Sequence, residues 1–194
     1  MNRREAIKRT SMMLGIAASS PIIMSILDGC VPQKELGYIP GFFNEDQAIL
    51  VADICDKILP KTATPGALDV GVDVFIDHMV GSCLSKEEQA IFTDGLIEVE
   101  AESNKLEGKN FGSLSDESKV KVLQILQEKT LDYEYDPHTG GQPFFTKIKE
   151  LTLLGYFTSE EIMTQHLDYV PIPARLEGCN DLKEGQKLIV GNHV

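Results

Sequence analysis

The side chains whose spacing comes closest to a metal site lie in one acidic segment, Asp132-Tyr133-Glu134-Tyr135-Asp136-Pro137-His138. Its alternating oxygen ligands could line one side of a calcium loop. The segment lacks the Gly at the sixth position and the Glu at the twelfth position of a calcium-binding helix-loop-helix. A solvated acidic loop with two tyrosines packed beneath it explains the same residues. We favour that interpretation and assign no metal ligand.

The remaining candidates for catalysis are few. The histidines are His78, His138, His166 and His193. None has a second His or Cys three or four residues away, the spacing that places two metal ligands on one helix face. We interpret His78, beside Asp77, as a rim residue and not a general base. The chain also contains no Gly-x-Gly-x-x-Gly, Cys-x-x-Cys-His or Gly-x-Ser-x-Gly motif. The sequence therefore predicts no catalytic and no cofactor-binding residue, and argues against a self-sufficient oxidoreductase.

The first 29 residues have the pattern of an export signal. Basic residues, including Arg3 and Arg4, precede an uncharged run from Thr10 to Leu27. The paired arginines resemble a twin-arginine signal, although Ala6 stands where that motif prefers an aromatic residue. Gly, Ser and Pro residues dilute the apolar run, which makes it a poor membrane-spanning helix. We expect Arg3 and Arg4 to direct export and the mature chain to be periplasmic.

The end of this signal resembles a lipoprotein processing site, Ile26-Leu27-Asp28-Gly29-Cys30. An aliphatic residue and a small residue precede the Cys that would carry lipid, while Asp28 departs from the usual small uncharged residue. Acyl chains on Cys30 would attach the chain to the membrane. Ordinary cleavage near Gly29, or an uncleaved signal, is the alternative.

The other three cysteines form an odd set once Cys30 is assigned to lipid, so in an oxidising compartment at least one is free or paired with another chain. Cys55 and Cys83 lie on or beside apolar helix faces, where a free Cys behaves as a small hydrophobe. Cys179 follows Gly178 in a Pro-rich tail that has too few apolar residues to hold itself against a domain. We expect Cys179 to contact a partner and form a disulfide with it. Pairing with Cys55 or Cys83, or a free thiol, is the alternative.

Composition indicates a globular chain that avoids nucleic acid. Of 194 residues, 25% are charged and 42% hydrophobic, which is enough for one domain with its own core. The formal net charge of −12 disfavours binding to phosphate backbones. We therefore exclude a nucleic-acid partner and expect an acidic surface that meets water or a basic protein face.

Helical periodicity predicts an all-α, single-domain bundle of about six helices over residues 44–194, after a tether at 30–43. The expected helices run from Asn44 to Leu59, from Val72 to Val80, from Ser85 to Leu106, from Ser115 through Leu126, from Pro143 to Gly155 and from Thr158 to Leu167. Asp53 and Asp77 fall on the polar stripes of the first two. From Asp168 onwards Pro and Gly predict an extended C-terminal segment, in which Leu188 to Val190 is the one strand-like pattern.

The connection between the first two helices is a predicted structural elbow. Pro60 ends the first helix, and Pro65-Gly66 is a dipeptide typical of a turn in which Gly takes a positive φ. The Phe144-Phe145 pair follows a later helix start, and we expect its exposed member to anchor a partner.

The order of several blocks resembles the gluconate 2-dehydrogenase subunit 3 family. The blocks are Leu59 to Ile76, Gln142 to Phe145, Lys149 to Thr152, Gly155 to Glu160, Tyr169 to Pro173 and Gly178-Cys179, which together span most of residues 42–180. The resemblance implies a small, exported, helical subunit that is itself non-catalytic and holds no cofactor.

The resemblance also implies the partner. It would be a flavoprotein large subunit of the glucose-methanol-choline type that binds FAD, oxidises gluconate or a related sugar or alcohol, and passes electrons to a cytochrome c subunit. This chain would then serve export, stability and membrane attachment. A free-standing envelope lipoprotein with a binding or scaffolding role is the alternative, and an enzyme that uses the loop from Asp132 to His138 is a third.

Overall fold

The structure is a computed structural model that describes residues 36–131, 141–170, 172, 181 and 184–191. The chain divides into two units after Glu35, and every described residue belongs to the second. The predictions for Arg3, Arg4, Cys30, the loop from Asp132 to His138, and Cys179 therefore concern residues outside the described part.

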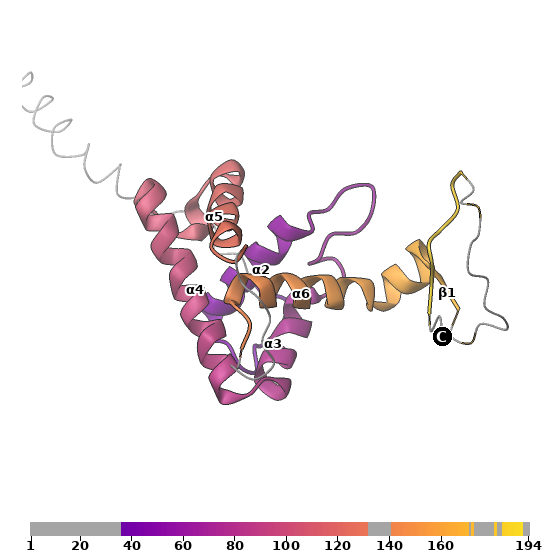
Figure 1. Cartoon of the computed structure of the whole chain (residues 1–194), viewed down its shortest axis with the longest axis horizontal. Coiled ribbons are helices and arrows are strands. Elements are labelled where there is room, and N and C mark those ends of the chain that lie inside the picture. Colours follow the sequence, from indigo (N-terminus) through magenta and orange to yellow (C-terminus); the bar gives the residue numbers. More distant parts are fainter. Residues whose placement is uncertain (1–35, 132–140, 171, 173–180, 182–183, 192–194) are drawn as a thin grey trace, which may run out of the picture. The chain divides into compact units, whose positions relative to one another are not determined.

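The described residues are mostly helical, which confirms that part of the predicted fold (Figure 1). The α-helices are α2 (Glu45–Ile58), α3 (Val72–Cys83), α4 (Lys86–Glu107), α5 (Asp116–Glu128) and α6 (Phe144–Phe157). A 3₁₀ turn, η1 (Phe111–Ser113), precedes α5, and a π-helical turn, η2 (Ile162–His166), follows α6.

Local capping signals explain where the long helices begin and end. Asn44 and Gln47 form a reciprocal capping box at the start of α2, and Ser85 and Glu88 form another at the start of α4. Gly108 ends α4 in the left-handed conformation with φ of 68°, which glycine adopts without steric cost.

The predicted helix start at Thr158 is wrong. Thr158 is instead the C-cap of α6, and its hydroxyl donates a 2.6 Å hydrogen bond back to the carbonyl of Leu154 one turn earlier. The helical backbone resumes after Ser159 and becomes the π-helical turn η2.

The extended C-terminal segment contains a small parallel sheet. β1 (Asp168–Tyr169) pairs with β2 (Ile189–Val190), with Asp168 opposite Ile189. The amides of Asp168 and Val170 donate to the carbonyls of Leu188 and Val190 at 3.0 and 2.9 Å. The strand at 189–190 lies within the predicted strand-like stretch, but two residues at β1 are too few to show periodicity.

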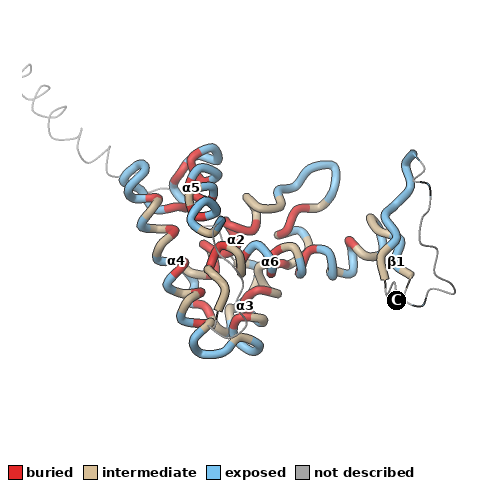
Figure 2. Tube along the Cα trace, viewed as in Figure 1, coloured by how far each residue is buried: buried red, intermediate tan, exposed pale blue. Residues whose placement is uncertain are grey.

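The core lies where α6 packs against α2, α3, α4 and α5, and buried residues gather on their inner faces (Figure 2). Phe92 of α4 stacks edge-on against Phe144 of α6, with ring centroids 5.1 Å apart. Gly95 permits this approach, because a Cβ atom there would overlap the Phe144 ring. Gly155 permits the corresponding contact with α3, where a Cβ atom would lie 2.6 Å from Phe75.

Residues 36–43 belong to the helical unit, although the sequence assigned them to the tether. Phe43 is buried in the core at 4% exposure, and Leu36 and Phe42 pack against it. The Asp77 carboxylate holds this segment on α3, since it accepts hydrogen bonds from the amides of Gly41, Phe42 and Phe43 at 2.7, 3.1 and 3.0 Å.

The connection from Pro60 to Gly71 is held by one hydrogen bond to α6 and by another within the connection itself. The Tyr156 hydroxyl of α6 donates to the carbonyl of Pro65 at 2.8 Å, and the Gly66 amide donates to the Asp69 carboxylate at 2.8 Å. The left-handed residue here is Gly71, with φ of 72°, so the predicted positive φ at Gly66 is wrong. Gly66 is needed for a different reason: a Cβ atom there would lie 2.7 Å from the Lys61 nitrogen.

Gly66→Val is therefore expected to lower the free energy of unfolding by about 1–3 kcal/mol, because the side chain would force two backbone segments apart. Chemical denaturation of both proteins measures this change. Ala63→Val in the same connection is the matched control, since Ala63 is exposed. Equal midpoints for Gly66→Val and wild type would contradict the close approach.

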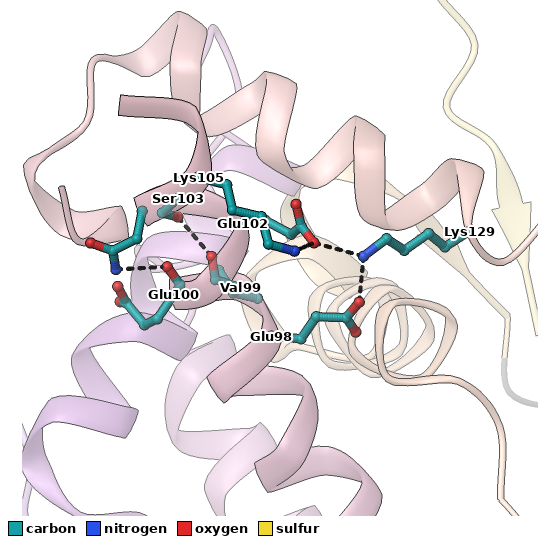
Figure 3. Close-up of polar contacts among 8 residues, drawn as sticks. Glu98, Val99, Glu100, Glu102, Ser103, Lys105 and Lys129 are labelled. Carbon is teal, nitrogen blue, oxygen red and sulfur yellow. Dashed lines mark hydrogen bonds and ion pairs between the residues drawn. The ribbon is translucent and has the colours of Figure 1, made fainter. Parts of the chain in front are cut away.

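An ion cluster joins α4 to α5 at the surface (Figure 3). The Lys129 ammonium lies 2.6 Å from a Glu98 oxygen and 2.9 Å from a Glu102 oxygen, and Lys105 pairs with Glu102 at 2.9 Å. Hydrogen bonds donated by Lys105 and then Lys129 lower the pKa of Glu102 below its usual value. The hydrogen bonds that Lys129 donates to Glu98 and then Glu102 raise the pKa of Lys129.

This cluster predicts a pH-dependent contribution to stability. A carboxyl group with a lowered folded-state pKa stabilises the fold above its unfolded pKa, about 4.3 for Glu, and that contribution disappears as the pH falls through the folded value. The melting temperature of Glu102→Gln should thus lie below that of wild type near neutral pH and converge with it in acid. Asp94→Asn, an exposed change on the same helix, is the control. A difference that is constant with pH would contradict this account.

Candidate partner-binding surface

The described residues offer no constellation for metal or membrane chemistry. No group of three or more His, Cys, Asp or Glu side chains among them could hold a metal ion. No helix in the same ranges is both long and apolar enough to cross a membrane. His78 is exposed on α3, next to the buried Asp77.

The buried charges within the described part serve the fold. Lys119 of α5 pairs with Asp53 of α2 at 3.1 Å, and both side chains are about nine-tenths buried. The Lys119 ammonium also lies 5.6 Å from the centre of the Phe111 ring. The polar-stripe prediction for Asp53 and Asp77 is therefore wrong, since each carboxylate is buried against a partner distant in sequence.

The cysteines of the described part differ in environment. Cys55 is buried, with its sulfur 3.6 Å from the Thr152 hydroxyl of α6. Cys83 is an exposed free thiol at the end of α3. Cys55 thus behaves as the expected small hydrophobe, whereas Cys83 does not.

The predicted aromatic anchor is not exposed. Phe144 and Phe145 are 6% and 7% exposed and both belong to the core. The first turn of α6 is enclosed by α4 and by the other helices, so neither ring has an exposed edge for a partner. The sequence prediction of an exposed member is wrong because the pair lies at the buried start of the helix that crosses the core.

The exposed apolar residues of α6 lie at its other end. Leu154 and Phe157 are 48% and 47% exposed and, three residues apart, share one helix face. The segment beyond α6 adds more exposed large apolar side chains: Tyr169, Ile172, Leu188 and Ile189. We call these six residues the α6-end surface. The signal for it in the sequence is Leu151 to Phe157, which is apolar on every side of the helix.

A polar hollow of about 550 Å³ adjoins this surface. It is lined by Asp69, Val70, Ser159, Glu160, Glu161, Thr164 and Gln165. Asp69 already has partners, and its pKa is lowered first by the Gly66 amide and then by Lys61. Glu160 and Glu161 are exposed and form no ion pair within the part of the chain that the structure describes. The hollow therefore carries two exposed carboxylates without an ion pair, while the Lys187 ammonium lies at its edge, 2.5 Å from the carbonyl of Gln165.

A comparison with known families identifies the family of the chain. The model of the family described as gluconate 2-dehydrogenase subunit 3 matches residues 45–174, from the start of α2 to beyond β1. The chain belongs to this family. It is thus a small subunit of a dehydrogenase complex. No curated protein and no solved structure matches it. The match includes α6 and η2, so much of the α6-end surface lies within the family region.

Proposed function

We propose that this subunit is the non-catalytic small subunit of a periplasmic, FAD-dependent dehydrogenase of the glucose-methanol-choline type, acting on gluconate or a related sugar or alcohol. The family match over residues 45–174 is the observation that carries the proposal. In this assignment the large subunit binds FAD and performs the oxidation, and a cytochrome c subunit can accept the electrons. The small subunit serves export, stability and membrane attachment of the large one.

The signal-like sequence at the N-terminus supports the export role. Twin-arginine export moves folded proteins, so a chain with Arg3 and Arg4 can carry a partner that has no signal and must bind FAD before it crosses the membrane. Lipid on Cys30 would then hold the complex at the membrane, and Cys179 would contact the large subunit. These three roles are parts of the same proposal.

Purification of a tagged copy from the native host tests the assignment. The wild-type chain should bring down an FAD-containing protein in equal amounts from the periplasmic fraction. Arg3→Lys/Arg4→Lys keeps the charge but removes the guanidinium geometry, so both proteins should then remain in the cytoplasm.

The control for export is Lys8→Arg, which preserves the paired arginines and should leave both proteins in the periplasm. A colourless chain without a flavoprotein, in either compartment, would contradict the proposal and favour a free-standing envelope lipoprotein. Unchanged export of the double Lys variant would contradict the twin-arginine route alone.

A further inference from the structure

The outer face of α6 is unusual for a helix that covers a core. Thr152 and Gly155 point inward and are buried, whereas Leu154 and Phe157 lie on the opposite side with about half of their surfaces exposed. A helix at the surface of a globular protein normally carries polar residues on its outer face. The end of α6 therefore has an apolar face that the described chain leaves open.

The small sheet beyond α6 also has exposed apolar side chains. β1 and β2 are two residues each, and Tyr169, Leu188 and Ile189 are 49%, 64% and 41% exposed. A two-stranded sheet is marginally stable by itself and needs a helix or further strands against its face. β1 packs against η2, and the Lys187 ammonium ties the approach to β2 to the Gln165 carbonyl at 2.5 Å. The segment thus lies against η2, which follows α6 (Figure 1), and several of its large apolar side chains are exposed.

Exposed apolar residues are concentrated here. Six of the eleven large hydrophobic residues that are exposed among the described residues belong to the α6-end surface. The others are Ile39, Ile97, Leu106, Val120 and Leu131, which lie on separate elements. Exposed apolar residues that gather in one region of the chain are more typical of a protein interface than the same residues scattered singly over the surface.

The charge of the rim selects among possible occupants. Glu160 and Glu161 would repel the anionic head groups of a membrane leaflet, so a lipid surface is disfavoured. A symmetric dimer of this chain would bring two copies of the same acidic hollow to one interface, which like-charge repulsion disfavours. A partner with an apolar patch flanked by Lys or Arg side chains would match both the exposed apolar residues and the acidic side chains of this surface.

We infer that the α6-end surface binds the dehydrogenase subunit of the complex, whose Lys or Arg side chains enter the hollow and pair with Glu160 and Glu161. This inference rests on the proposed function, which supplies the identity of the occupant. Leu154 and Phe157 form the apolar centre of the contact, and the β1–β2 segment becomes covered when the complex forms. Phe144 and Phe145 act only through the core that supports α6.

The experiment uses the tagged chain purified from its native host and measures FAD recovered per chain. Leu154→Ser/Phe157→Ser should reduce the recovered FAD at least tenfold relative to wild type. Ile97→Ser/Leu106→Ser, which changes two exposed residues on α4, is the matched control and should recover FAD as wild type does. The melting temperature of each variant, purified without partner, checks that the fold is retained.

Charge reversal tests the hollow independently. Glu160→Lys/Glu161→Lys should lower FAD recovery several-fold, because a basic partner would be repelled. Glu87→Lys/Glu117→Lys is the control, since these residues are also exposed acids in first helical turns, on α4 and α5. Wild-type recovery should also fall as salt rises, because screening weakens exposed ion pairs.

The outcomes separate the two proposals. If wild type recovers a flavoprotein and the Leu154/Phe157 variant recovers as much, the inference is wrong and the proposed function stands. If wild type recovers none, both are wrong. Light scattering that shows a wild-type dimer lost in the same variant, or flotation with phosphatidylglycerol vesicles lost in it, would overturn the inference in favour of self-association or membrane contact.

Discussion

Replacing Asp77 with Ala is expected to lower the free energy of unfolding by about 3–5 kcal/mol, the largest effect we predict for a polar side chain on α3. The carboxylate accepts three hydrogen bonds from the backbone amides of residues 41–43. A hydrogen bond to a charged group contributes roughly 1.5–3 kcal/mol, and a buried donor left without a partner adds a desolvation cost. The sum is smaller than three full contributions because the segment can loosen and admit water.

The structural consequence should be local as well as global. Without the carboxylate, residues 36–43 lose their attachment to α3, and Phe43 leaves the Phe92 ring against which it packs with centroids 5.6 Å apart. The amides of Gly41, Phe42 and Phe43 should exchange with solvent hydrogen much faster than in wild type. Denaturation midpoints and amide exchange by NMR measure the two effects.

His78→Ala is the matched control for Asp77→Ala, because His78 is the next residue on α3 and is exposed. It should change stability by less than about 0.5 kcal/mol. Asp77→Asn retains one oxygen acceptor and should be intermediate. An Asp77→Ala protein with the wild-type midpoint and protected amides at residues 41–43 would show that the carboxylate does not hold this segment.

The reason that sequence analysis missed Asp77 is its place in the helical pattern. Asp73 and Asp77 are four residues apart, so they share a stripe that periodicity assigns to solvent. The partners of Asp77 are about 35 residues away in a stretch without periodicity. Patterns within one helix carry no information about such a contact. The helix starts at Asn44 and Ser85, in contrast, depend on residues three positions apart, and the structure confirms both predicted starts.

The same limit explains the candidate surface. The apolar run from Leu151 to Phe157 predicts a helix but does not tell which of its sides meets the core. Two close approaches determine which side of α6 meets the core. Gly95 of α4 admits the Phe144 ring, and Gly155 of α6 admits the Phe75 ring of α3. Only with that placement do Leu154 and Phe157 become outward residues and Phe144 and Phe145 core residues.

Lys119→Met is expected to cost about 3–5 kcal/mol, because it removes the cation from a buried pair and leaves the Asp53 carboxylate in an apolar site. Met keeps most of the apolar stem that packs over Phe111, so lost packing is a minor part of the effect. Lys121→Met, an exposed change two residues along α5, is the control and should be near neutral.

A second substitution, Asp53→Asn, tests whether the buried charge of Asp53 causes this loss of stability, because the sign of its effect on the unfolding free energy should depend on Lys119. In wild type, Asp53→Asn should destabilise, since it leaves the Lys119 ammonium without its carboxylate. In the Lys119→Met background the same Asp53→Asn change should stabilise, because it removes a buried charge that has lost its partner. A double-mutant cycle from urea denaturation gives the coupling, expected to be about 2–4 kcal/mol for a pair with both side chains nearly excluded from water. If Asp53→Asn destabilises both backgrounds equally, the two residues act independently, and α2 and α5 are joined by apolar packing and by the surface pair of Lys57 with Asp116 at 2.9 Å.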